Sequence, residues 1–194
     1  MTKRKLGVSS THSVFTYVRL HEAAKCVLEQ AEATEEGRFY HCMCSNVLSA
    51  FCIEAYLNHI CEKLVPYWND ELKKDISVRN KLTIICGHLN LTLDFSCRPF
   101  QSWDDIFAFR NQLAHGKSEN ISYHGTQTIR DDELPKYPKT WWEECSNIVT
   151  AKRWLADTES MVTKIHEAAG KGGAPFLVPS THSYVATLEA RSRR

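Results

Sequence analysis

The sequence lacks any apolar run that approaches the roughly 18 residues of a membrane-spanning helix. No apolar block follows the basic residues at positions 3–5, so we do not expect a secretory signal or a membrane partner. An excess of charge of one sign is also absent, because 24 Lys and Arg residues accompany 23 Asp and Glu residues and the net charge is +1. A polyanion such as RNA must therefore be held by a local patch rather than by the field of the whole molecule.

What is present is the composition of one globular domain. The chain has 194 residues, of which 43% are hydrophobic and 24% are charged. A domain of this size buries roughly 70% of the surface of its unfolded chain. It therefore needs neither a disulfide nor a metal ion to fold.

The eight cysteines include no CxxC pair, which argues against a structural zinc site. Three pairs of potential ligands are spaced two residues apart: Cys42 and Cys44, His59 and Cys61, and Cys86 and His88. On a helix this spacing puts two side chains about 200° apart, so a pair cannot hold one ion together. We expect free thiols in the core of a cytoplasmic protein, with no metal and no cofactor.

Apolar residues that recur every three or four positions predict an all-α fold, an up-and-down bundle of four to five helices. The predicted helices cover residues 13–33, 38–65, 77–89, 102–115 and 141–169. Gly37 and Pro66 end helical patterns, Ser102 is a suitable N-cap, and Gly116 is a suitable residue after a helix end. Strand signals are nearly absent.

Three regions follow from these patterns. Residues 1–12 form a basic N-terminal segment, residues 13–169 a helical domain, and residues 170–194 a tail that contains Gly and Pro. Inside the domain, residues 117–140 form a long polar loop, and the sequence leaves open whether residues 121–129 form a small hairpin. Loops of this length in compact domains often serve a function.

The helix predicted over 102–115 ends in polar residues that suit phosphate chemistry. Arg110 can bind a phosphate through two hydrogen bonds, His115 can move a proton, and Asn111 can orient either group. Lys117 follows directly and can contact RNA. Arg110 and His115 are five residues apart, which separates them by about 140° around the helix axis. The alternative is structural, since Arg and His near a helix end also bind its free carbonyl groups.

Glu54 lies on the otherwise apolar seam of the helix predicted over 38–65, and Asn58 follows four residues later. A carboxylate on such a seam must be paired or neutralised. Two interpretations remain: a structural partner for Arg110 or for a backbone donor, and a catalytic role.

The segment 109–117 resembles the R-x4-6-H signature of the HEPN superfamily, with the frequent Asn directly after the Arg. The segment 45–58 is similar to the HEPN helix that carries a Glu and then an Asn four residues later. The resemblance covers most of residues 13–169, including the order of helices. It implies a helical bundle that dimerises, so that the motif helices of two chains line one cleft.

The resemblance also implies a function. Many HEPN proteins are metal-independent endoribonucleases, including toxins and phage-defence effectors, and others only bind or scaffold. Arg110 is then expected to hold the scissile phosphate and His115 to act on the 2′-hydroxyl or the leaving oxygen, with Asn111 assisting. Glu54 and Asn58 would give structural support. The expected products are a 2′,3′-cyclic phosphate and a 5′-hydroxyl.

Two functions therefore remain open. The first is an endoribonuclease toxin or defence effector that has RNA as its substrate, acts as a homodimer and is paired with a cognate antitoxin or a nucleotidyltransferase-like partner. The second is a non-catalytic HEPN-like module for dimerisation or partner binding. Three tryptophans near the motif are candidates for a dimer interface, where aromatic residues are enriched: Trp103, Trp141 and Trp142.

Overall fold

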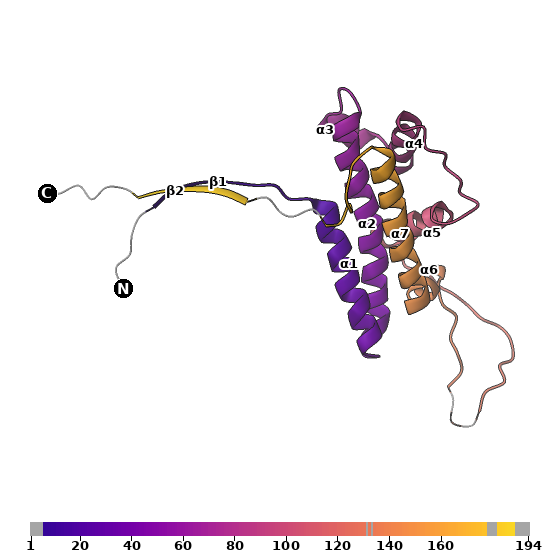
Figure 1. The fold of residues 1–194 in the computed structure, drawn as a ribbon. Coiled ribbons are helices and arrows are strands. Elements are labelled where there is room, and N and C mark those ends of the chain that lie inside the picture. The colour runs from indigo at the N-terminus through magenta and orange to yellow at the C-terminus, as the bar shows by residue number, and fades with distance from the viewer. Residues whose placement is uncertain (1–5, 131, 133, 178–181, 189–194) are drawn as a thin grey trace, which may run out of the picture.

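The computed structural model describes residues 6–130, 132, 134–177 and 182–188, and its body is all-α (Figure 1). The helices of this part of the chain are α1 Thr16–Ala33, α2 Arg38–Leu64, α3 Asp70–Asp75, α4 Val78–His88, α5 Trp103–His115, α6 Trp141–Cys145 and α7 Ile148–Ala168, with a 3-10 turn Phe100–Ser102 before α5. The predicted all-α class is confirmed. No helix of the described residues is long and apolar enough to cross a membrane.

The 27-residue helix α2 lies at the centre of the body and packs against α1, α4, α5 and α7 (Figure 1). Because neighbours cover it on several sides, its buried residues extend beyond the single predicted seam. Ala50 and Leu57, which lie on the apolar seam that carries Glu54, are buried. Cys52, Ile53 and Tyr56, which lie off that seam, are buried as well. The core therefore follows α2 from end to end.

The predicted helix over 141–169 is wrong at residues 146 and 147, where the structure divides it into α6 and α7. The Asn147 side chain accepts a hydrogen bond from the Thr150 backbone N–H at 3.0 Å and so begins a new helix. The Ser146 hydroxyl donates to the Trp142 carbonyl at 2.8 Å and closes the preceding turn. The short helix α3, which Asn69 caps, was not predicted at all.

Ser102 does not act as the predicted N-cap of α5. Its hydroxyl instead donates a hydrogen bond to the buried carboxylate of Asp157 on α7 at 2.5 Å. The Arg98 Nε donates to the other oxygen of the same carboxylate at 2.7 Å. Asp157 therefore anchors the connection between α4 and α5 to the last long helix.

Gly116 follows α5 as predicted, but for a different reason. Its φ of −63° is open to any residue, so no left-handed conformation requires glycine. A Cβ atom at this position would approach the Gln112 carbonyl oxygen to 2.2 Å. The close approach of the two backbone segments is what requires the glycine.

Two strands that the sequence did not predict join the ends of the described chain. Strand β1 (Leu6–His12) pairs antiparallel with β2 (His182–Leu188), and Leu6 lies opposite Leu188. This ribbon extends away from the helices, as does the loop of residues 117–140 at the other side of the body (Figure 1). Residues 121–129 form no strand, so the hairpin is not present.

All eight cysteines are free. Four of them are buried, and burial raises the pKa of the Cys52 thiol to about 12 and that of the Cys86 thiol to about 11. Such thiols stay protonated and pack as small apolar groups. Among the described residues, no group of three His, Cys, Asp or Glu side chains is placed to hold a metal ion.

A basic pocket as candidate functional site

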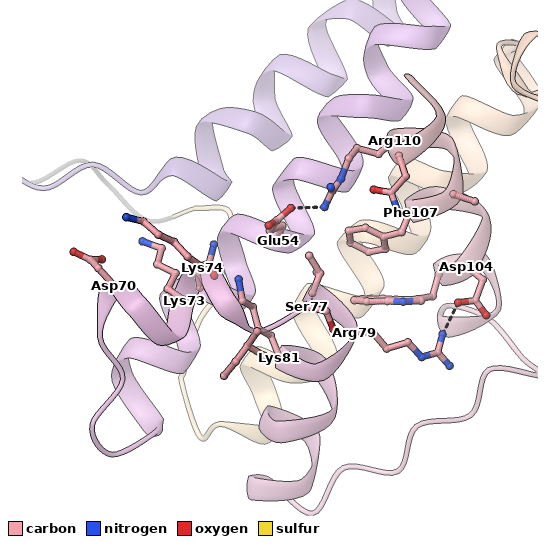
Figure 2. Close-up of a pocket in the computed structure, with 16 residues that line it drawn as sticks. Glu54, Asp70, Lys73, Lys74, Ser77, Arg79, Lys81, Asp104, Phe107 and Arg110 are labelled. Atoms are coloured by element: carbon pink, nitrogen blue, oxygen red, sulfur yellow. Dashed lines mark hydrogen bonds and ion pairs between the residues drawn. The ribbon is translucent and has the colours of Figure 1, made fainter. Parts of the chain in front are cut away.

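A pocket of about 850 Å³ opens between α2, α3, α4 and α5 (Figure 2). Its charged lining consists of five cations and three carboxylates: Lys73, Lys74, Arg79, Lys81 and Arg110, and Glu54, Asp70 and Asp104. The pocket therefore has an excess of two positive charges, although the whole chain is nearly neutral. It provides the local patch that a polyanion requires.

Four of the predicted site residues meet in this pocket. Glu54 and Asn58 lie one turn apart on α2, and Arg110 and Asn111 lie on α5, which packs against α2. An Arg110 terminal nitrogen donates to the Glu54 carboxylate at 2.6 Å (Figure 2). The packing of α5 on α2 thus joins two sequence motifs that are more than fifty residues apart.

The Arg110 guanidinium is held from more than one direction. Its side chain is 18% exposed, and its central carbon lies 5.6 Å from the centre of the Phe107 ring. Its Nε is buried and has no hydrogen-bond partner. Glu54 therefore fixes the group but does not use all of its donors.

His115 and Lys117 do not belong to the pocket. His115 is the last residue of α5, is exposed, and is not among the residues that line the cavity. Lys117 is also exposed and lines a separate hollow of about 410 Å³ beside the loop of residues 117–140. Within one chain His115 therefore lies outside the pocket that holds Arg110, which agrees with their offset of about 140° around α5.

The lysines of the pocket were not predicted from the sequence, and Lys81 is the most informative of them. It is 3% exposed, and burial lowers the pKa of its ammonium group while the nearby Glu54 opposes that shift. Lys81 precedes Ile85 by four residues and so falls on the buried stripe of α4. A lysine on an apolar helix stripe was the signal that could have identified it.

Arg79 was not predicted as a site residue, yet it lines the pocket. It forms an ion pair with Asp104 (Figure 2). Its guanidinium carbon also lies 4.2 Å from the centre of the Phe95 ring. This contact neutralises one side of the pocket. The remaining charge is concentrated on Lys73, Lys74 and Lys81.

The structure corrects one of the tryptophan assignments. Trp103 is 2% exposed and belongs to the core of the chain, so the prediction that it supplies a dimer interface is wrong. Trp142 is partly buried against the same core. Trp141 is 44% exposed and is the most exposed of the three.

Comparison with protein families, with curated proteins and with solved structures gives no match. The HEPN resemblance therefore depends on the residues of this chain alone: the segment 109–117, the Glu54 and Asn58 pair, and the order of the helices.

Proposed function

We propose that the chain is a metal-independent endoribonuclease of HEPN type, that its helical body is an up-and-down HEPN-like bundle, and that it acts as a homodimer in the cytoplasm. The observation that supports this proposal most directly is the pocket in which Glu54 positions Arg110 beside Asn111. The excess positive charge of the pocket favours a phosphate backbone. Free thiols suit a reducing compartment.

The proposed chemistry needs one phosphate, one cation and one proton acceptor. Arg110 binds the scissile phosphate and stabilises the charge that develops on it. His115 takes the proton of the ribose 2′-hydroxyl, the 2′ oxygen attacks phosphorus, and the bond to the 5′ oxygen breaks. The leaving oxygen takes up a proton, which yields a 2′,3′-cyclic phosphate and a 5′-hydroxyl.

The separation of Arg110 from His115 favours a site shared by two chains. His115 lies outside the pocket of its own chain, at the exposed end of α5. In the proposed dimer, the α5 ends meet, and His115 of one chain reaches the phosphate bound by Arg110 of the other. Lys117 follows His115 by two residues, and the exposed Trp141 lies beside α5, with its ring centre 6.3 Å from that of Phe109.

The second candidate is a non-catalytic module for dimerisation or partner binding. The same ion pair between Arg110 and Glu54 favours it, because a paired Arg110 can have a structural role alone.

If the endoribonuclease is a toxin, its partner is a cognate antitoxin. A neighbouring gene for a nucleotidyltransferase-like protein would support that class.

Complementation between two inactive variants tests the shared site. Purified Arg110→Lys and His115→Ala proteins are each incubated with total RNA in EDTA, then mixed and assayed again. Lysine keeps the charge but not the two-pronged geometry of arginine, so we expect loss of cleavage in Arg110→Lys. His115→Ala is expected to lower the rate roughly 10²–10⁴-fold. When the two variants pair at random, half of the dimers contain one chain of each variant, and each of these mixed dimers has one intact site of two. We therefore expect the mixture to recover about a quarter of the wild-type rate.

The outcomes separate the candidates. No recovery in the mixture, with each variant inactive alone, would mean that Arg110 and His115 act within one chain. Wild-type protein that leaves RNA intact in EDTA, and in Mg²⁺, would remove the enzyme proposal and leave the binding module.

A further inference from the structure

Two cations share a single carboxylate at the inner end of the pocket. A carboxylate oxygen of Glu54 lies 2.6 Å from a terminal nitrogen of Arg110. The negative charge of Glu54 also raises the pKa of the Lys81 ammonium group. One positive charge at this end is therefore not neutralised by the chain itself. Figure 2 shows Lys81 and Arg110 on different walls, with Glu54 between them.

Lys81 is a mostly buried residue whose ammonium group still reaches the cavity. Its residue is 3% exposed and lines the cavity, yet within the described part of the chain its ammonium group forms no hydrogen bond or ion pair. An ammonium group that faces the cavity without an acceptor can bind an anion that enters the cavity. The buried Arg110 Nε is likewise without an acceptor. Both observations indicate an anion as the missing component.

The outer part of the pocket extends the same charge. Lys73 and Lys74 lie on α3, one turn after Asp70 of the same helix, while Asp104 neutralises Arg79. Figure 2 shows Lys73, Lys74 and Lys81 close to one another, so the positive charge of α3 continues to Lys81. Such a cluster of positive charge attracts phosphates.

The size and the walls of the pocket suit a nucleotide. Its volume of about 850 Å³ lies within the range of small-molecule sites, roughly 300–1,000 Å³. Trp103, Phe107 and Val78 supply apolar surface beside the charged groups. An ammonium and a guanidinium together are the groups that most often bind phosphate in proteins.

We propose that Lys81 and Arg110 together bind a phosphate group of a nucleotide in this pocket. Lys81 is then a phosphate-binding residue of the site, and the lysines of α3 hold the neighbouring phosphates. The inference rests on the proposed function in using Arg110 for the same substrate, but binding requires no cleavage. The phosphate can come from the backbone of RNA or from a free mononucleotide, and the two sources are separable.

The test compares Lys81→Met with Lys164→Met, which removes an exposed lysine of α7 outside the pocket. Binding is measured by calorimetry with three probes: inorganic phosphate, adenosine 5′-monophosphate, and a 2′-O-methyl RNA hexamer without terminal phosphates, which cannot be cleaved through its 2′ oxygen. We expect Lys81→Met to weaken binding of at least one probe roughly tenfold or more. Lys164→Met should bind as the wild type does. The melting temperature of Lys81→Met should not fall, because methionine keeps the apolar stem and no hydrogen bond or ion pair of the described residues is lost with the ammonium group.

The probes identify the source of the phosphate. A loss confined to adenosine monophosphate and inorganic phosphate assigns the site to a terminal phosphate, and a loss with the hexamer assigns it to the RNA backbone. Equal binding by Lys81→Met and Lys164→Met for all three probes, or no binding by the wild type, overturns the inference.

Cleavage assays keep the two proposals apart. Wild-type cleavage of RNA together with unchanged binding by Lys81→Met refutes the role of Lys81 and leaves the ribonuclease in place. Binding that depends on Lys81 in a wild type that does not cleave RNA refutes the ribonuclease and leaves the phosphate site.

Discussion

At the scale of single residues, the contact between Glu54 and Arg110 determines how the pocket is built. The carboxylate is 29% exposed and the guanidinium 18%, so water screens the pair less than it screens an ion pair on the surface. Removing one partner leaves the other half-buried and uncompensated. The pair therefore affects stability as well as the position of Arg110.

Replacing Arg110 should destabilise the fold, although the helix-end position in the sequence predicts little effect. We expect Arg110→Ala to lower the free energy of unfolding by about 1–3 kcal/mol, because Glu54 loses its hydrogen-bond donor. Urea denaturation followed by circular dichroism measures the change. His115→Ala is the matched control on the same helix, and we expect it to stay within about 0.5 kcal/mol of the wild type because His115 is exposed. Equal losses in both variants would contradict the structural role of the pair.

The sequence predicted four of the residues that line the pocket, all on α2 and α5, and none of those on α3 and α4. Arg110 and Asn111, and likewise Glu54 and Asn58, are close in the chain and carry a recognisable spacing. The lysines of α3 and α4 have no such spacing relative to α5, because their position depends on how α4 packs against α2. Tertiary packing brings them to the site, and local sequence does not encode it.

At the scale of elements, apolar periodicity predicted the long helices, but helix ends depended on side-chain contacts that periodicity does not show. The break before α7 comes from the Asn147 cap, and the start of α5 differs because Ser102 binds Asp157 instead of capping. A hydroxyl near a helix start can make either contact. Only the position of α7, set by the whole fold, decides between them. The β1–β2 ribbon was missed for a similar reason, because its strands pair across the full length of the chain.

Asp157 should contribute more to stability than an exposed carboxylate in a comparable ion pair. Its side chain is 2% exposed and it accepts hydrogen bonds from Arg98 and Ser102. We expect Asp157→Ala to lower the free energy of unfolding by about 3 kcal/mol, because both donors lose their acceptor. Asp104→Ala is the control: its carboxylate is 73% exposed, and we expect a change of about 0–1 kcal/mol. Equal effects in urea denaturation would show that Asp157 does not anchor the α4–α5 connection.

At the scale of the whole molecule, the helical body contains two histidines whose pKa burial lowers, one on α2 and one on α7. Burial lowers the pKa of His59 and of His166 from the usual 6.5, and nearby lysines add to the shift. His166 lies 3.2 Å from the Tyr56 hydroxyl and is 8% exposed. The folded chain therefore takes up protons at these sites at a lower pH than the unfolded chain does.

This difference predicts a loss of stability in mild acid. Between pH 7.5 and 5.5 the unfolded state binds more protons than the folded state, so the free energy of unfolding should fall as the pH drops below about 6.5. The His59→Gln/His166→Gln double variant should show a smaller fall in urea denaturation at pH 7.5, 6.5 and 5.5. His88→Gln, at an exposed position of α4, should keep the wild-type dependence. A double variant with the full wild-type dependence would contradict the assignment.

The β1–β2 ribbon has a consequence for how the chain can be rearranged. Because Leu6 lies opposite Leu188, a short peptide can connect the two ends into a circle without moving the helices. The exposed loop of residues 117–140 then offers a place to open that circle. Every residue that lines the phosphate pocket lies between Glu54 and Asn111, so a circular permutant that starts at α6 and ends after α5 keeps the entire pocket in one uninterrupted stretch.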